Sequence, residues 1–281
     1  MKKIVVIGGG TMGLDIAQVF ARNGYDVVVR DIKDEIIQAS EARLNKGLDK
    51  LVSKGKLDEA GKAAITGKMT FTTDLNLAAD ADLVGEAAVE NLDIKKSIFA
   101  ELDSLCKPET ILASNTSSIS ITAIAAATKR ADKFIGMHFF NPATVMKLVE
   151  VIRGQKTADA TVAAVYEVAQ GMGKTAVECK TDTPGFIVNR CLFAFMLEAI
   201  HCYEEGVASV DDIDTAIKLG LNHPMGPFEM MDMSGLDTFP HVTETLESLP
   251  VTTWKCPESV KKLVAEGKFG RKSGEGWHKY N

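Results

Sequence analysis

The start of the chain combines an apolar strand, a glycine-rich turn and an amphipathic helix, and this combination restricts the fold more than any other feature. Residues 4–7 form a continuous run of β-branched apolar residues, which is typical of a strand buried on both faces of a parallel sheet. A helical pattern of apolar residues follows over 12–23, and residues 25–29 have the pattern of a second strand. Together these segments predict a βαβ unit of an open α/β sheet.

Glycines with the spacing G-x-G-x-x-G separate the first strand from the helix. In such a turn, Gly8 permits the sharp bend, Gly10 lets the backbone approach a pyrophosphate, and Gly13 lets the helix pack on the strand. Thr11 and Met12 lie at the helix N-terminus, where backbone donors and the helix dipole favour a phosphate group. The alternative is a tight turn without a ligand. Because strand, helix and second strand all occur in register, the segment predicts a dinucleotide site.

An acidic residue, Asp31, follows the second strand and bears on the choice of cofactor. Its carboxylate would accept hydrogen bonds from both ribose hydroxyls and would repel a 2′-phosphate, which favours NAD over NADP. Arg30 keeps NADP open, because a guanidinium beside the ribose can pair with a 2′-phosphate or simply lie in solvent. We therefore expect NAD as the cofactor, with NADP as the alternative.

Strands and helices continue to alternate along the first two thirds of the chain, which predicts a doubly wound, Rossmann-like α/β domain over residues 1–183. Residues 36–68 have the pattern of two helices interrupted by Gly55, and we expect this pair to project beside the sheet. A further helix is predicted over 93–105. Further strands are predicted at residues 83–85, 111–113, 134–137 and 147–152.

Beyond the turn-forming residues 182–185, the pattern changes to helices, which predicts a mostly α-helical second domain over residues 184–281. Residues 186–205 are apolar nearly all round and predict a buried helix, although the same pattern suits a subunit interface. Asp211 or Asp212 is expected to cap the next helix, which runs to residue 219, and later helices are expected up to about residue 266.

Charge and hydropathy exclude several classes of function. The 281 residues include 32 basic and 38 acidic side chains, and the resulting formal charge of -6 disfavours nonspecific binding to nucleic acid or anionic lipid. The longest uncharged run, residues 110–128, is too polar to cross a membrane. The chain begins with a strand pattern instead of a signal peptide, and we therefore expect a cytoplasmic protein.

Metal chemistry and disulfide bonds have no support in the sequence. The five cysteines are widely spread without a C-x-x-C pair, so we expect reduced thiols in the core and no zinc site. His201, His241 and His278 form no cluster with the spacing of metal ligands. We expect no bound metal.

Six further motifs occur in a fixed order along the chain. They are ASNTSS (113–118), HFFNP (138–142), MKLVEV (146–151), DTPGFIVNR (182–190), HPMGP (223–227) and GRKSGEG (270–276). In this order and spacing the chain resembles the L-3-hydroxyacyl-CoA dehydrogenases over nearly its whole length, and most of all the bacterial members that act on 3-hydroxybutyryl-CoA. The resemblance implies hydride transfer between NAD and the pair acetoacetyl-CoA and (S)-3-hydroxybutyryl-CoA, in a homodimer or higher homo-oligomer.

Two residues have the pattern of an acid-base pair. His138 and Glu150 lie on successive strand-like segments, and a reversal centred near Thr144 would place them opposite each other on one face of a sheet. The resemblance implies that they form the catalytic dyad, in which His138 moves the hydroxyl proton while Glu150 orients the ring and stabilises its charged form. Without Glu150 in register, His138 would be interpreted as a packed core histidine. We expect His223, in a turn flanked by proline and glycine, to be structural.

Ser117 and Asn189 are candidate donors to the reacting oxygen. The resemblance implies that Ser117 hydrogen-bonds the 3-oxygen region of the substrate next to the cofactor, and that Asn189 completes the site from the start of the second-domain helix. A hydroxyl and an amide can both stabilise a developing alkoxide without competing for the proton. The alternatives are a strand-end cap for Ser117 and a buried polar residue for Asn189.

The resemblance also implies further contacts to the cofactor. Glu90 and Lys95 match family positions near the nicotinamide ribose, Asn141 matches a cofactor contact after the catalytic strand, and Lys272 matches a contact to the nicotinamide half. Without the resemblance, Glu90, Lys95 and Lys272 would be interpreted as exposed charges.

A stripe of basic residues provides a candidate site for CoA. Arg43, Lys46, Lys50 and Lys54 are spaced by three, four and four residues, which places them along one helix face. Most such stripes are solvated surface. A substrate that carries a 3′-phosphate and a pyrophosphate would give this one a use, and the resemblance implies that Lys54, with Lys50 one turn away, binds CoA.

One of the departures from the family pattern bears on cofactor binding, and two alternative functions stay open. Asp15 stands where the family commonly has a small residue, and its charge could repel the cofactor phosphates. The first alternative function is a dehydrogenase of a free 3-hydroxy acid. The second is a non-catalytic, crystallin-like relative that binds nucleotides.

Overall fold

The computed structural model describes residues 1–240, 243 and 256–280. The chain divides into two compact units, Met1–Phe186 and Ile187–Asn281. The predicted domain boundary after residue 183 lies close to this division. Each unit is described by itself below.

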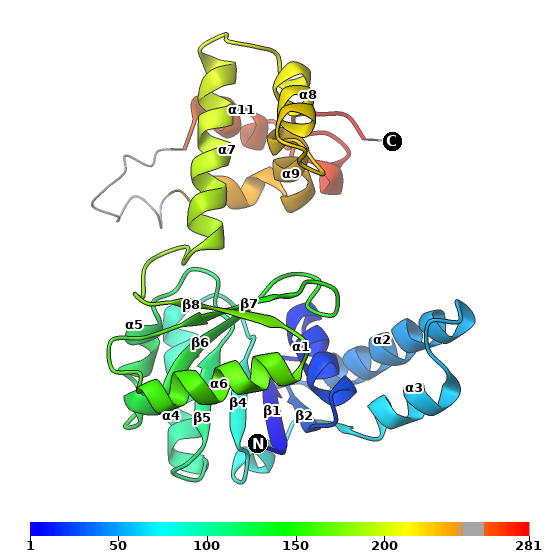
Figure 1. Ribbon diagram of the computed structural model, residues 1–281, viewed down its shortest axis with the longest axis vertical. Helices are drawn as coiled ribbons and strands as arrows, with labels where there is room; N and C mark the ends of the chain where they lie inside the picture. The colour runs from blue at the N-terminus through cyan, green and yellow to red at the C-terminus, as the bar shows by residue number, and fades with distance from the viewer. Residues whose placement is uncertain (241–242, 244–255, 281) are drawn as a thin grey trace. The chain divides into compact units, whose positions relative to one another are not determined.

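Within residues 1–186, all of which are described, an eight-stranded sheet forms the centre of the unit (Figure 1). Its strands are β1 (Lys3–Ile7), β2 (Asp26–Arg30), β3 (Met69–Thr72), β4 (Leu83–Glu86), β5 (Ile111–Ser114), β6 (Phe134–Phe139), β7 (Leu148–Ile152) and β8 (Thr175–Cys179). The strand order is β3-β2-β1-β4-β5-β6-β7-β8, and the β6–β7 pair is antiparallel whereas the other neighbours are parallel. The chain reverses its direction of winding between β1 and β4, which is where open α/β sheets bind ligands.

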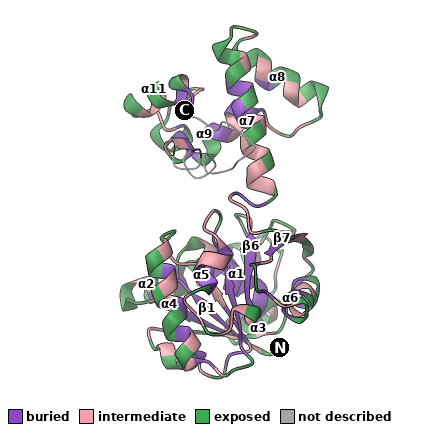
Figure 2. Ribbon diagram, turned by 90° about the vertical axis from the view of Figure 1, so that its left-hand side faces the viewer, coloured by how far each residue is buried: buried purple, intermediate pink, exposed green. Residues whose placement is uncertain are grey.

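Helices cover both faces of this sheet, as the sequence predicts. They are α1 (Thr11–Arg22), α2 (Asp34–Ser53), α3 (Glu59–Thr66), α4 (Leu92–Leu105), α5 (Ile121–Ala125) and α6 (Asp159–Gly171), with short 3-10 turns η1 (Leu75–Ala78) and η2 (Ala131–Lys133). Successive residues of β1 enter opposite cores, because Ile4 packs with Phe20 of α1 whereas Val5 packs with Phe99 of α4. The strands are accordingly among the most buried parts of the unit (Figure 2).

Helices α2 and α3 lie side by side and project from one side of the sheet, which confirms the predicted helical pair (Figure 1). Leu44 and Leu48 of α2 and Ile65 of α3 are buried, so one apolar face of the pair contributes to the core. Asp58 caps α3 by accepting a hydrogen bond from the Gly61 amide. The pair therefore presents its other face, with the basic stripe, to solvent.

Two strands and two helices of this unit are absent from the prediction, namely β3, β8, α5 and α6. Strands β3 and β8 are the two edges of the sheet, and most of their side chains are only partly buried. Edge strands lack the continuous apolar run that marks a central strand, which is why the pattern does not reveal them.

The C-terminal unit is mostly helical in its described part, as predicted. Its elements are α7 (Val188–Glu204), α8 (Val210–Gly220), α9 (Pro227–Ser234), the 3-10 turn η3 (Leu236–Thr238), α11 (Glu258–Ala265) and the 3-10 turn η4 (Arg271–Ser273). Its core contains Met196 and Ile200 of α7, Phe228 and Met231 of α9, and Val260 of α11.

Two local predictions for this unit are wrong. Only the second half of α7 is buried within the unit, at Met196, Leu197, Ala199 and Ile200, whereas its first turns are half-buried or exposed. Helix α8 is capped by Ser209, whose hydroxyl accepts the Asp212 amide, and not by Asp211 or Asp212. The cap lies two or three residues earlier because the serine hydroxyl can reach the free amides of the first turn.

The cysteines are less uniformly buried than expected. Cys106 and Cys179 are buried, Cys191 is exposed, and Cys202 and Cys256 are half-buried. None of these five cysteines, all within the described ranges, forms a disulfide. The expectation of core thiols is therefore wrong for Cys191, because its face of α7 is not covered within the unit.

The described residues contain no helix of the length and hydrophobicity that a membrane span requires. They also contain no group of three or more His, Cys, Asp or Glu side chains arranged to hold a metal ion. His241 lies outside the described residues.

Candidate active site

The glycine-rich turn between β1 and α1 is tightly packed except where a ligand would approach. Gly8 has a φ of +107°, and a Cβ atom there would lie 2.6 Å from the Ala87 carbonyl oxygen. A Cβ atom at Gly13 would lie 1.9 Å from the Gly8 carbonyl oxygen, whereas one at Gly10 would meet no atom within 4 Å. Helix α1 begins after Gly10 without a side-chain cap. The turn therefore fits a pyrophosphate, with open space at Gly10 and backbone amides of the first helical turn available as donors.

Asp31 lies at the carboxyl end of β2, beside this turn. Its Oδ2 accepts the Gly9 amide at 2.7 Å, and its Oδ1 accepts the Ile32 amide at 2.7 Å. The carboxylate is thus held at the position where the ribose of a dinucleotide is recognised in this fold. The neighbouring Arg30 donates its Nε–H to the Thr73 carbonyl oxygen at 3.3 Å.

Arg43, the first residue of the basic stripe, also contacts the glycine-rich turn. Its guanidinium donates to the Gly9 carbonyl oxygen at 3.2 Å and to the Thr11 hydroxyl at 3.3 Å. Sequence analysis groups Arg43 with the CoA stripe and misses this contact, because α2 must first pack on the sheet before residue 43 meets residue 9. Burial raises the pKa of the nearby Asp15 carboxyl, although the positive charge of Arg43 opposes the rise.

His138 and Glu150 face each other across β6 and β7. The antiparallel register pairs these residues, as the length of the connecting loop predicts. The imidazole Nδ1 lies 2.7 Å from Glu150 Oε2, and the side chains are only 4% and 1% exposed. The ring also packs against Phe140 and Phe186, with ring centroids 4.6 and 5.7 Å away. Because a carboxylate accepts hydrogen bonds, we assign the Nδ1 hydrogen to this contact, which leaves Nε2 for other partners.

Ser117 lies at the other nitrogen of the same ring. Its hydroxyl oxygen is 3.1 Å from His138 Nε2, and its side chain is exposed, in contrast to the buried dyad. Strand β5 delivers Ser117, because the residue follows the carboxyl end of that strand, next to the carboxyl end of β6. The three side chains therefore form a continuous line from buried Glu150 through His138 to the surface at Ser117.

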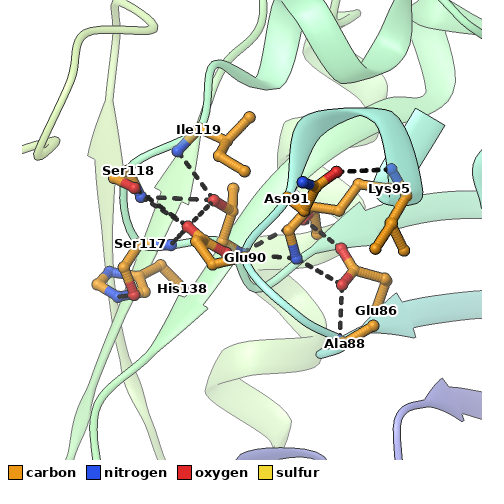
Figure 3. A network of polar contacts seen from close by, with 12 residues as sticks. Glu86, Ala88, Glu90, Asn91, Lys95, Ser117, Ser118, Ile119 and His138 are labelled. Atoms are coloured by element: carbon orange, nitrogen blue, oxygen red, sulfur yellow. Dashed lines mark hydrogen bonds and ion pairs between the residues drawn. The ribbon is translucent and has the colours of Figure 1, made fainter. Parts of the chain in front are cut away.

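A polar network supports the turn that carries Ser117 (Figure 3). Oε1 of Glu90 accepts the amides of Ser117 at 3.0 Å and Ser118 at 3.2 Å, together with the hydroxyls of Thr116 and Ser118. Burial tends to raise the pKa of Glu90, but the Thr116 hydroxyl, the positive charge of Lys95 and the two backbone amides outweigh it and lower the pKa. Glu90 is thus held ionised beneath the turn.

Lys95 is buried, so the interpretation of this residue as an exposed charge is wrong. Its side chain is 1% exposed, and its Nζ lies 2.6 Å from Glu86 Oε1 and 3.4 Å from Glu90 Oε2. Glu90 itself has a side chain that is 41% exposed. Sequence analysis cannot separate these two charged residues, since Glu90 lies on the segment that joins β4 to α4 and Lys95 follows closely in the first part of α4.

Glu86 and Asn115 are site residues that sequence analysis misses. Glu86 ends β4 and is fully buried, and Asn115 Oδ1 accepts the Phe139 amide at 2.8 Å, next to the dyad histidine. The signal for Glu86 was an acidic residue that directly follows an apolar strand. Such a residue lies at the ligand-binding edge of a parallel sheet.

Asn141 lies exposed in the loop between β6 and β7 and precedes a cis proline, Pro142. Lys174 holds this loop, because its Nζ donates to the carbonyl oxygens of Ala143 and Met146, each at 2.6 Å. The predicted cofactor contact, Asn141, therefore lies on a loop that Lys174 anchors, and this loop connects the strands that carry His138 and Glu150.

The predicted CoA residues lie on the projecting helix. Lys46 and Lys50 are exposed on α2, and Lys54 is exposed directly after its last residue, Ser53. The stripe therefore begins with Arg43, which contacts the glycine-rich turn, and continues outward along α2.

Asn189, Lys272 and His223 belong to the C-terminal unit. Asn189 is half-buried in the first turn of α7, and Lys272 in η4 forms an ion pair with Asp237. The His223 ring packs against Phe195, with centroids 5.6 Å apart.

Comparison with known proteins identifies both units. Residues 3–183 match the family model described as the NAD binding domain of 3-hydroxyacyl-CoA dehydrogenase, and residues 185–280 match its C-terminal domain. The chain is 50% identical over 279 residues to a probable 3-hydroxybutyryl-CoA dehydrogenase of Deinococcus radiodurans, a match that covers 99% of this chain and 100% of the relative. It is 46% identical to human mitochondrial hydroxyacyl-coenzyme A dehydrogenase, covering 100% of this chain and 91% of the relative.

A solved structure agrees with these matches. The fold superposes on (S)-3-hydroxybutyryl-CoA dehydrogenase from Ralstonia eutropha with a TM-score of 0.96 and 43% identity, covering 100% of this chain and 99% of the other. The glycine-rich turn, the sheet order and the helical second unit are thus those of a known enzyme family. The chain belongs to the 3-hydroxyacyl-CoA dehydrogenases, a family of oxidoreductases with an NAD-binding domain.

Proposed function

We propose that this enzyme interconverts acetoacetyl-CoA and (S)-3-hydroxybutyryl-CoA, with His138 and Glu150 as a general acid-base dyad. The observation that carries the proposal is the buried Nδ1 to Oε2 contact of 2.7 Å, with Ser117 at the other ring nitrogen. This arrangement lies at the same sheet edge as the glycine-rich turn, because β1, β4, β5 and β6 run parallel. Relatives named 3-hydroxybutyryl-CoA dehydrogenase support the choice of a short acyl chain.

The chemistry follows from the orientation of the imidazole. When bound, NAD supplies or accepts the hydride at C3 of the substrate. During reduction, His138 Nε2 gives its proton to the developing alkoxide, and during oxidation it takes the hydroxyl proton. Glu150 stabilises the charged ring and keeps Nε2 directed outward. The Ser117 hydroxyl donates to the alkoxide without competing for the transferred proton.

Membership of the family adds further residues to the proposal. Asn189 of the C-terminal unit would act as a second donor to the reacting oxygen. Glu90, Lys95 and Asn141 would surround the nicotinamide half of NAD, with Lys272 as a further contact. Lys95 would act from beneath the surface, since its ammonium group is held between Glu86 and Glu90.

NAD is the proposed cofactor in preference to NADP. The Asp31 carboxylate lies at the ribose position and would repel a 2′-phosphate. Arg30, which could have paired with that phosphate, instead donates to the Thr73 carbonyl oxygen. Lys50 and Lys54 are proposed to bind the phosphates of CoA.

The direct test is turnover of acetoacetyl-CoA, followed by the absorbance of the reduced nicotinamide. We expect turnover with NADH to exceed turnover with NADPH, and the His138→Gln variant to lose about two to four powers of ten in kcat, because it cannot transfer the proton. His223→Gln, a histidine outside the dyad, is the matched control and should retain wild-type kcat. Equal turnover by the wild type and His138→Gln would contradict the proposal.

The same assay separates the alternative functions. A dehydrogenase of free hydroxy acids would reduce acetoacetate as readily as acetoacetyl-CoA, whereas we expect a strong preference for the CoA ester. A non-catalytic relative would bind NADH without any turnover.

A further inference from the structure

We infer that Glu86 is a positioning residue of the active site. Its buried carboxylate holds Lys95 so that Glu90 in turn fixes the Ser117 turn against His138. The inference rests on the proposed function, because Ser117 and His138 are the residues that it positions.

Glu86 is held by donors from separate segments of the N-terminal unit. Its Oε1 accepts Lys95 Nζ of α4 at 2.6 Å and the Ala88 amide at 2.7 Å, and its Oε2 accepts the Ser114 hydroxyl of β5 at 2.6 Å. The residue is fully buried. Since a buried carboxylate is costly unless it is paired, the site keeps this charge only because these donors surround it. The carboxylate thus ties the ends of β4 and β5 to the first turn of α4.

Lys95 transmits this constraint to Glu90 (Figure 3). Its ammonium group lies between the two carboxylates, at 2.6 Å from Glu86 and 3.4 Å from Glu90. The closer contact to Glu86 keeps Lys95 from moving onto Glu90. One ammonium and two carboxylates leave the cluster with a net negative charge, so the position of Lys95 determines how that charge is distributed.

Glu90 sets the geometry of the catalytic serine. Because its Oε1 accepts the backbone amides of Ser117 and Ser118, a shift of this carboxylate moves the backbone of the turn. The Ser117 hydroxyl lies 3.1 Å from His138 Nε2, and its position follows that of the turn backbone. A second path leads to the same turn, since the Ser114 hydroxyl bound by Glu86 also accepts the Thr116 amide at 3.3 Å. Glu86 therefore acts on the reacting groups without touching them.

The test is the Glu86→Gln variant of the full-length enzyme. The amide keeps the size of the side chain and can still bond Ser114 and Ala88, but it removes the charge that faces Lys95. We expect kcat for acetoacetyl-CoA reduction to fall about 10- to 100-fold while KM for acetoacetyl-CoA stays near wild type. We also expect faster hydrogen exchange at the Ser117 and Ser118 amides, measured without substrate or cofactor.

The matched control is Asp103→Asn, at the other end of α4. Asp103 pairs with Arg130 at 2.7 Å, and these side chains are 8% and 13% exposed. The substitution removes a similarly enclosed charge far along the helix from the Ser117 turn. We expect it to lower stability without changing kcat or the exchange of Ser117 and Ser118.

The double variant Glu86→Gln/Lys95→Met separates positioning from stability, and it serves also if the single variant fails to fold. With both charges removed, we expect the stability to unfolding to recover, while kcat stays low and the Ser117 and Ser118 amides still exchange fast. Recovery of kcat together with stability would overturn the inference, as would wild-type exchange at these amides in Glu86→Gln. If the wild type has no turnover but Glu86→Gln still speeds this exchange, the proposed function fails and the structural link stands.

Discussion

At the scale of single residues, the site depends on charged side chains whose roles are set by burial. His138 and Glu150 are both buried and bonded to each other, while Ser117 is exposed at the outer nitrogen of the ring. In our proposal, the transferred proton therefore enters and leaves at His138 Nε2, on the side of the ring where Ser117 lies. From the sequence, Lys95 is expected to be an ordinary surface lysine of α4. In the structure, its side chain is buried beneath the same site, between the carboxylates of Glu86 and Glu90.

The lowered pKa of Glu90 predicts a pH-dependent contribution to stability. Its folded-state pKa lies below the ordinary value of 4.5, so its stabilising effect is complete above pH 4.5 and is lost as the pH falls through the lower folded value. We expect the wild type to unfold at higher urea than Glu90→Gln at pH 7, and the difference to shrink when the pH is lowered below 4.5. Urea unfolding at pH 7, 5 and 3 measures it, and a difference independent of pH would contradict the prediction.

At the scale of elements, the parallel sheet gathers the functional groups at one edge. Strands β1, β4, β5 and β6 deliver the glycine-rich turn, Glu86, Ser117 and His138 at their carboxyl ends. Strand β7 runs antiparallel to β6, which is why Glu150 reaches His138 from the neighbouring strand. The α2–α3 pair is the projecting element, and its exposed stripe belongs to substrate binding in our proposal.

Removal of the stripe charges should weaken CoA binding without affecting the chemical step. We expect Lys50→Ala and Lys54→Ala each to raise KM for acetoacetyl-CoA about two- to fivefold, because an exposed ion contact contributes roughly 1 kcal/mol or less. The kcat and the KM for NADH should stay at wild-type values. Lys62→Ala on α3 is the control, since Lys62 already pairs with Asp49. An unchanged KM for acetoacetyl-CoA in both stripe variants would assign the stripe to solvated surface.

At the scale of the whole molecule, the C-terminal unit exposes several large apolar side chains. Val207, Leu219, Leu221 and Met233 are 54% to 81% exposed, and the first turns of α7 are also uncovered within the unit. Exposed apolar groups on this scale favour burial against another surface. We therefore propose that the homodimer or higher homo-oligomer implied by the sequence forms through the helical unit.

Sedimentation of the purified protein tests this assembly. We expect a mass of about twice the 30.3 kDa of the chain, and a shift toward the single-chain mass in Leu219→Glu, because a carboxylate in an apolar interface is costly. Leu77→Glu, an exposed apolar residue of the N-terminal unit, is the control and should not change the mass. A wild-type mass of one chain at all concentrations would rule out the dimer.

Much of the site could be predicted because its signals are local in the chain. The spacing of the glycines specifies a turn in which Gly8 and Gly13 leave no room for a side chain, whereas Gly10 faces open space. The short loop between β6 and β7 determines which residues face each other. Ordered motifs along the chain led to the family that the comparisons then showed. The edge strands β3 and β8 were missed, since partly exposed strands carry a weak apolar pattern.

The sequence by itself determined the βαβ unit, the pairing of His138 with Glu150 and the membership of the family, because each depends on spacing within a short segment or on the order of motifs. Only the tertiary structure decided that Lys95 is buried between Glu86 and Glu90, and that Arg43 contacts the glycine-rich turn. The polarity of a side chain does not predict whether folding will bury it. That depends on which distant strands and helices pack around it, and whether they bring a partner of opposite charge.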